Sequence, residues 1–228
     1  MSEAAFLLLH LDGPMLGWGG TARDGRRPSA EVPGVSAITG LLANAVGWRY
    51  EDAERTEALK RSLRLACCRL ELPGAELFDD YQTARLRITD RGWTRRGSEG
   101  RTGDNSDGTT ILRKQYRANV SCRAAVGLRA NAPVTVQELE DALRRPARTL
   151  FLGRRSCLPS MPILGARVSA VSAYVALRAW VADAIAIWHN DGEQGDVVET
   201  DDRDFRTDRW AAGSRAWRLV LGGGGSRE

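Results

Sequence analysis

The sequence predicts an α+β fold built on a ferredoxin-like βαββαβ unit, which presents an open sheet and glycine-containing loops. The predicted elements follow the order strand, helix, strand, insertion, strand, helix, strand. Hydrophobic residues make up 43% of the 228 residues and charged residues 27%, as in globular proteins with one sizeable core. No apolar run approaches membrane-spanning length, so no membrane partner is expected.

The first half of the chain supplies a strand, two helices and a second strand. Phe6–Leu11 is predicted as a buried strand that Gly13-Pro14 ends. No basic leader precedes it, which favours a cytoplasmic protein. Pro33 starts a helical pattern that Gly47 ends. A second helix is expected over Glu51–Arg64 and a strand over Leu65–Leu72.

The second half begins with a polar insertion and returns to regular elements. Arg91–Thr110 predicts a long loop or a protruding hairpin, because it offers little to bury. A strand is expected over Val120–Arg129. Thr135 and Glu138 form a capping box for a helix that Pro146 ends. Thr149–Leu152 is predicted as a short strand leading into Gly153-Arg154-Arg155-Ser156-Cys157.

The last quarter is predicted as a β extension packed on the same core. A helix is expected over Ser169–Arg178, with strands over Ala184–Trp188 and Arg215–Leu221. Asn190–Arg209 is polar throughout. The expected organisation is therefore a main domain over residues 1–165 with an insertion at about 84–117, an extension over 166–221, and a disordered tail over 222–228.

Positive charge is concentrated in the insertion and is almost entirely arginine. Only Lys60 and Lys114 are lysines. A GC-rich genome explains a high arginine total but not this clustering. Between residues 84 and 117 there are nine basic and four acidic residues, so this segment carries a charge of +5. The whole chain carries +4, so the remainder is close to neutral. Arginine binds phosphate bidentately and stacks on bases, so the clustering favours an RNA partner.

Catalytic and metal chemistry have little support in the sequence. His10 lies inside the first strand, and His189 follows a strand and is expected to be solvated. Neither forms a Ser-His-Asp or Cys-His pattern by spacing. The four cysteines form no C-x-x-C pair, so buried, reduced thiols are expected rather than zinc. The sequence therefore predicts no enzyme, metal or other cofactor.

An arginine-rich window is the strongest candidate for phosphate binding. Between Ala142 and Cys157 there is no acidic residue, and the window contains Arg144, Arg145, Arg148, Arg154 and Arg155. Gly153 lets the backbone approach a ligand, and Ser156 adds a hydroxyl donor. Trp18 lies between glycines, where it could stack on a base or fill the core, and its position alone favours the core.

Three stretches in order resemble the CasD family of type I-E CRISPR Cascade subunits, within the RAMP superfamily. Leu11–Gly19 is similar to that family's L-x-G-P-[LM]-x-x-W-G opening. Val32–Gly47 is similar to its P-T-[KR]-S-x-x-x-G-L-L-x-x-x-L-G helix, and Leu152–Ile163 to its Y-L-G-R-[KR]-S-C-P-L-x-x-P-L block. Asp80–Thr83 and Ser214–Trp217 are weaker matches. The resemblance covers nearly the whole chain, and the third block is the most specific.

The resemblance implies a RAMP (RRM-like) fold that holds the 5′ handle of the CRISPR RNA (crRNA), with the insertion as a protruding thumb hairpin. The implied partners are a CasC-type backbone subunit, a CasA-type large subunit, the small subunit, the RNA-processing subunit and, indirectly, target DNA. The expected RNA-binding residues are Trp18, Arg26, Arg27, Ser36, Tyr81, Gln82, Arg113, Lys114, Arg154, Arg155, Ser156 and Cys157.

Two departures from the family pattern bear on function. Gly34-Val35-Ser36 replaces T-[KR]-S, so one handle contact is lost unless Arg26 or Arg27 replaces it. Gln82 replaces the histidine of D-Y-H-T. Related type I-C subunits cut precursor RNA with a side-chain base, so a metal-independent endoribonuclease is the alternative, with Tyr81 and Lys114 as candidate residues. The shortage of histidines favours the non-catalytic hypothesis.

Overall fold

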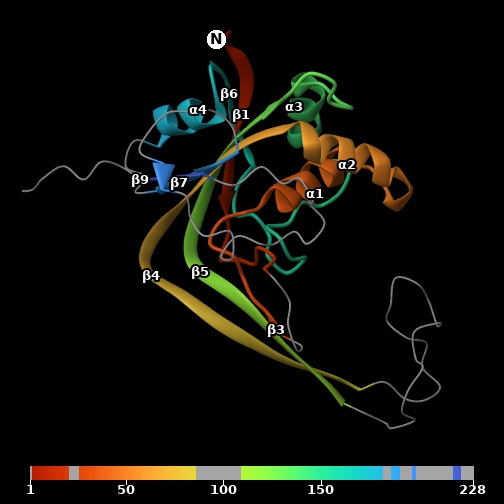
Figure 1. Ribbon diagram of the computed structural model, residues 1–228. Coiled ribbons are helices and arrows are strands. Elements are labelled where there is room, and N and C mark those ends of the chain that lie inside the picture. Colours follow the sequence, from red (N-terminus) through yellow and green to blue (C-terminus); the bar gives the residue numbers. More distant parts are fainter. Residues whose placement is uncertain are drawn as a thin grey trace, which may run out of the picture.

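The computed structural model describes residues 2–20, 26–85, 109–181, 186–190, 197–198 and 218–221 (Figure 1). Its elements follow the order β1 (Ala4–Asp12), β2 (Met15–Leu16), β3 (Arg26–Arg27), α1 (Val35–Val46), the 3-10 helix η1 (Tyr50–Asp52), α2 (Ala53–Ser62), β4 (Leu63–Arg85), β5 (Thr109–Leu128), α3 (Val136–Arg144), β6 (Leu164–Ala170), α4 (Ala173–Trp180), β7 (Ala186–His189), β8 (Val197–Val198) and β9 (Arg218–Leu221).

A curled, mainly antiparallel sheet organises this α+β fold. Its strand order is β6-β1-β5-β4-β7-β9-β8, and β2 and β3 pair with β5 beyond the end of β1. The β3–β5 pair is parallel, whereas the other pairs are antiparallel. β5 therefore pairs with four other strands, β1, β2, β3 and β4. The predicted mixture of helices with an antiparallel sheet is confirmed.

β1 is apolar from Ala4 to Leu9 because both of its faces are covered. Leu7, Leu9 and Leu11 belong to the larger core, which α1 and α3 cover. Phe6 and Leu8 belong to a second core under α4. Successive residues of a strand point to opposite faces, so a strand between two cores needs apolar residues at successive positions. Figure 1 shows α4 on the opposite side of the sheet from α1 and α3.

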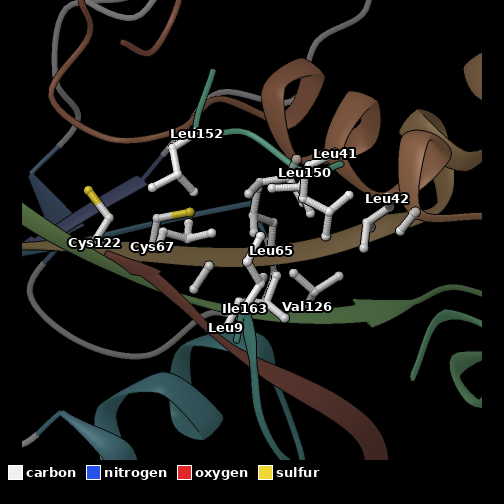
Figure 2. Close-up of a cluster of buried hydrophobic side chains, with 14 of the residues drawn as sticks. Leu9, Leu41, Leu42, Leu65, Cys67, Cys122, Val126, Leu150, Leu152 and Ile163 are labelled. Carbon is white, nitrogen blue, oxygen red and sulfur yellow. The ribbon is translucent and has the colours of Figure 1, made fainter. Parts of the chain in front are cut away.

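The first two helices follow local signals closely. α1 ends at Gly47, which has φ 93° and donates its N–H to the Ala43 carbonyl. Figure 2 shows Leu41 and Leu42 of α1 pointing toward the strand residue Leu65. The second predicted helix is shorter than expected, because Leu63 already belongs to β4.

α3 begins with the predicted capping box. The Thr135 hydroxyl accepts from the Glu138 N–H, and the Glu138 carboxylate accepts from the Thr135 N–H. Leu139 and Leu143 lie in the larger core.

β4 and β5 continue far beyond the core as a paired arm, which we define as residues 76–85 and 109–118. Residues 72–75 stand opposite the single residue Asn119 and interrupt the register. Gly74 (φ 77°) and Asn119 (φ 50°) adopt left-handed conformations, and the Asn119 side chain donates to the Gly74 carbonyl at 3.0 Å. Such a bulge bends the paired strands. The arm consequently runs away from the helices in Figure 1.

The strand predictions need four corrections. The expected strands over Leu65–Leu72 and Val120–Arg129 are far longer, since charged residues continue the pairing outside the core. Thr149–Leu152 is not a strand, because the Leu152 backbone bonds to Gly17 and Cys157. The strand that pairs with β1 is instead β6, whose side chains are mostly exposed and carry no apolar alternation. Ser169 and Ala170 end β6, and the helix begins only at Ala173.

The prediction for His189 was also wrong, because this side chain is buried against Tyr174 at a ring distance of 5.3 Å. Residues 86–108, 199–217 and 222–228 lie outside the described residues, and with them most of the predicted insertion loop, the Ser214–Trp217 match and the tail. No helix of the described ranges is both long and apolar enough to cross a membrane.

All four cysteines are free and fully buried, as predicted. Burial raises the pKa of the Cys68 thiol to about 11 and that of Cys122 to about 12, and it also raises the pKa values of Cys67 and Cys157. The thiolate is the reactive form. We therefore expect native protein at pH 8 to react with a thiol reagent only as fast as it unfolds, whereas protein in denaturant exposes all four thiols at once. Rapid labelling of the native chain would contradict this packing.

Candidate nucleic-acid interface

The two glycine-containing motifs of the sequence meet at one backbone crossing. Gly153 has φ 86°, and a Cβ there would lie 2.3 Å from the Gly17 carbonyl oxygen. The Gly17 N–H donates to the Leu152 carbonyl at 3.2 Å. A Cβ on Gly13 would likewise lie 2.6 Å from the Leu158 carbonyl oxygen. These glycines are required for close approach, since any side chain would separate the two segments.

The turn formed by Leu152–Cys157 is closed by its own backbone hydrogen bonds and is held against the larger core by two buried side chains. The Leu152 N–H donates to the Cys157 carbonyl at 2.7 Å, and the Cys157 N–H donates to the Arg154 carbonyl at 2.8 Å. Leu152 and Cys157 are buried in the larger core, and Figure 2 shows Leu152 with the other core side chains. Arg155 and Ser156 are consequently left on the exposed side of the turn.

Arg154 is committed to structural contacts. Its guanidinium donates to the Gln115 carbonyl at 2.6 Å, to the Arg27 carbonyl at 2.7 Å and to the Pro28 carbonyl at 3.3 Å. It also lies over the Tyr116 ring at 4.6 Å. One side chain thus joins the turn, β5 and the segment after β3, and few of its donors remain for phosphate.

β3 places two further arginines beside the arm. Arg26 pairs with Arg113 and Arg27 with Lys114 along the parallel β3–β5 register. The segment after β3 returns over Trp18, whose carbonyl accepts from the Ala30 N–H at 2.9 Å. Arg117 adds a hydrogen bond to the Ala30 carbonyl at 3.2 Å. Two cations of β3 are therefore paired with two cations of β5 from a distant part of the sequence.

A cleft of about 880 Å³ lies between the arm, the turn and the segment around β3. It is lined by Met15, Gly19, Gly20, Arg27, Pro28, Phe78, Asp79, Asp80, Tyr81, Gln82, Lys114, Tyr116, Arg154, Arg155 and Ser156. Its walls combine cations, amides, hydroxyls and aromatic rings. Proteins that bind single-stranded RNA commonly use such a mixture, in which cations contact the RNA backbone and polar or aromatic groups contact the bases.

A chain of side-chain hydrogen bonds crosses the arm inside the cleft. The Lys114 ammonium donates to Gln82 Oε1 at 2.6 Å, and Gln82 Nε2 donates to Asp80 Oδ2 at 2.6 Å. On the neighbouring register position, the Arg113 guanidinium lies over the Tyr81 ring at 5.8 Å. Tyr81 remains 55% exposed, so one face of its ring is available to a ligand.

Catalytic and metal-binding constellations are not evident at this cleft. Both histidines lie elsewhere: His10 packs edge-on against Trp180 at 4.9 Å, and His189 is in the second core. Burial, with the charge of Arg123, lowers the pKa of His10, so this side chain is neutral at physiological pH. Within the described ranges, no three His, Cys, Asp or Glu side chains are close enough together to hold a metal ion.

Comparisons with known proteins place the chain in a family. The family model described as "CRISPR-associated protein (Cas_Cas5)" matches residues 6–218.

The chain belongs to the Cas5 family of CRISPR-associated proteins.

A curated relative in this family is the "CRISPR system Cascade subunit CasD" of Escherichia coli strain K12, which is 28% identical over 222 residues. The match covers 96% of this chain and 97% of the relative. A chain of a solved "CRISPR RNA-guided surveillance complex" has a TM-score of 0.57 at 20% sequence identity, with 95% of this chain and 89% of that chain covered. The structural likeness supports the fold, and the predicted family resemblance is confirmed.

Seven of the residues predicted for this Cas5-family chain line the cleft: Arg27, Tyr81, Gln82, Lys114, Arg154, Arg155 and Ser156. Arg26 and Arg113 lie beside it on paired strands. Trp18 and Cys157 are buried, so neither side chain is exposed at the cleft, and their predicted contacts with RNA stay a prediction. Ser36 lies in the first turn of α1 and is not part of the lining.

The arginine-rich window is divided by the structure. Arg144, Arg145 and Arg148 lie at the end of α3 and in the segment after it, outside the cleft lining. Arg148 donates to the Trp48 carbonyl, and Arg144 pairs with Glu140 at 2.8 Å. Proximity in sequence therefore does not bring these three arginines to the cleft.

Sequence reasoning missed the other half of the cleft wall. Phe78, Asp79, Asp80 and Tyr116 line it because β4 and β5 continue as an arm. Leu77 and Phe78 are adjacent apolar residues among polar ones, so no period-2 alternation indicates this part of the strand.

The backbone crossing gives a sharp test of this site. Gly153→Ala forces a left-handed alanine and a clash with the Gly17 carbonyl, so we expect a loss of more than about 2 kcal/mol in the free energy of unfolding. Gly19→Ala is the matched control, because a Cβ there meets no atom within 4 Å. Urea denaturation followed by circular dichroism measures both. Equal stability of the two variants would contradict the crossing.

Proposed function

We propose that this chain is a non-catalytic crRNA-binding subunit of a type I-E CRISPR Cascade surveillance complex in antiviral defence. It holds the 5′ handle of the crRNA in the cleft between the arm, β3 and the Leu152–Cys157 turn. The observation that carries the proposal is the convergence of Arg27, Lys114 and Arg155 with Ser156 on one cleft, in a chain whose relative is a Cascade subunit.

The chemistry of the cleft supports RNA rather than a small anion. Phosphate binding requires cations spaced along a strand, and β3, the arm and the turn supply them from three directions. Tyr81 and the amide of Gln82 offer stacking and hydrogen bonding to splayed bases, which is how single-stranded RNA is read. Target sequence is then read by the guide RNA through base pairing, not by this protein.

The proposal includes an assignment of the fold. The four strands β6-β1-β5-β4 with α1 and α3 form the ferredoxin-like RAMP unit, within residues 1–165 and the neighbouring strand β6. The arm is the base of the thumb hairpin, which therefore starts well before residue 84. Residues 166–221 are proposed as the extension on the same core, and residues 222–228 lie outside the described residues.

The proposed partners follow from the same assignment. The chain caps the backbone filament against a CasC-type subunit and contacts a CasA-type large subunit, with the small and RNA-processing subunits in the same cytoplasmic complex. Target DNA is reached only through these partners. No cofactor is required for this role.

The role of Arg155 can be separated from that of Arg154. Arg155 is exposed and has no hydrogen-bond or ion-pair partner among the described residues, so Arg155→Ala should lower the salt slope of handle binding by about 1 and leave stability within about 0.5 kcal/mol. Arg154→Ala removes charge-assisted bonds and should cost about 1.5–3 kcal/mol of stability.

The matched control is Arg145→Ala, an exposed arginine outside the cleft. Fluorescence anisotropy with handle RNA over a salt series measures the slopes, and chemical denaturation measures stability. An unchanged slope for Arg155→Ala, or an equal loss of slope for Arg145→Ala, would place the RNA elsewhere.

The non-catalytic assignment is tested against the type I-C-like alternative, which Tyr81 and Lys114 favour by lying together in the cleft. The Lys114 ammonium already donates to Gln82, so we expect no site-specific cleavage when purified protein is incubated with repeat RNA in EDTA. Gel analysis of end-labelled RNA measures the products. Cleavage that disappears in Tyr81→Phe or Lys114→Ala would establish the endoribonuclease instead.

A further inference from the structure

Two carboxylates line a cleft whose other charged groups are cations. Asp79 and Asp80 face the same space as Arg27, Lys114 and Arg155. A carboxylate beside an RNA backbone repels phosphate, so a cleft for phosphate alone gains nothing from these groups. Carboxylates in nucleic-acid sites accept hydrogen bonds from base amino or imino groups. The cleft therefore contains acceptors that suit a base.

Asp80 is held in a fixed position by its neighbours. It lies directly opposite Lys114 in the strand register, yet the two are joined through Gln82. Lys114 donates to Gln82 Oε1, which orients Nε2 toward Asp80 Oδ2. Asp80 Oδ1 accepts no hydrogen bond from any described residue, and two of the three ammonium donors of Lys114 remain for a ligand.

The remaining groups match one base better than the others. The Watson–Crick edge of guanine presents one acceptor, O6, followed by two donors, N1–H and N2–H. Lys114 can donate to O6, and the Asp80 carboxylate can accept from both donors. Adenine and cytosine each offer the carboxylate one amino group beside a ring-nitrogen lone pair, N1 and N3 respectively, and uracil offers it a single donor flanked by carbonyl oxygens. Both arrangements are repulsive at a fixed carboxylate.

We propose that Asp80 is a specificity-determining residue that selects an unpaired guanine in this cleft, with Lys114 and Gln82 as the groups that orient it. The inference rests on the proposed function, since it assumes that crRNA occupies the cleft. It adds the identity of one base and the residue that reads it. Asp79, which instead accepts from Gln115 Nε2 at 3.3 Å, is not part of this reader.

The test uses the full chain and short oligouridylate RNAs that differ at one central base. Fluorescence anisotropy should give about tenfold tighter binding for central guanosine than for adenosine, with inosine between them because it lacks the N2 amino group. Asp80→Asn keeps the side-chain shape and should reduce the guanosine preference to less than about twofold, as expected when one bidentate contact is lost. Asp79→Asn removes the same charge and should tighten binding to every RNA while keeping the preference.

The outcomes separate this inference from the proposed function. Wild-type binding without base preference, or a preference unchanged in Asp80→Asn, overturns the role of Asp80 but leaves RNA binding at the cleft. Equal tightening by both variants reduces Asp80 to an electrostatic effect and also overturns the role. Failure of all RNAs to bind overturns the proposed function together with the inference.

Discussion

The cleft depends on the crossing of Gly153 over the Gly17 carbonyl. At this point two segments that are more than a hundred residues apart in sequence share a backbone hydrogen bond and have no space for a side chain. Cys157 and Leu152 bind the turn to the core on one side, and Arg154 binds it to β5 on the other. The exposed arginine and serine are positioned only because these contacts fix the turn.

Arginine has two distinct physical roles in this protein. Arg154 donates hydrogen bonds to the backbone carbonyls of Gln115 and Arg27. Arg123 forms an ion pair with the Asp12 carboxylate at 2.6 Å, on the α4 side of the sheet. Arg27 and Arg155 instead line the cleft. The number of arginines therefore does not by itself measure the size of the RNA-binding surface, because some of them make contacts within the fold.

Local signals in the sequence predicted the elements whose partners are nearby. The buried run of β1, the glycine that ends α1 and the capping box of α3 each act within a few residues. The misses involve distant partners. The fourth strand of the expected unit was placed at Thr149–Leu152, yet Leu152 begins a turn, and the exposed edge strand β6 pairs with β1.

The candidate site shows the same division. Motif order identified the Gly13–Gly19 segment and the Leu152–Cys157 turn, and the structure brings them together. Nothing local in the sequence indicates that Arg154 bonds to carbonyls 39 and 127 residues away. Side-chain partners set by tertiary packing leave no local pattern.

The most direct test of this account is photo-crosslinking of thiouridine-substituted handle RNA to the assembled complex, with the crosslinked peptides of this subunit identified by mass spectrometry. The account predicts crosslinks in β3, in the arm near Tyr81 and Lys114, and in the turn at Arg155 and Ser156. Crosslinks confined to the segment Arg144–Arg148, or their absence from the cleft, would contradict it.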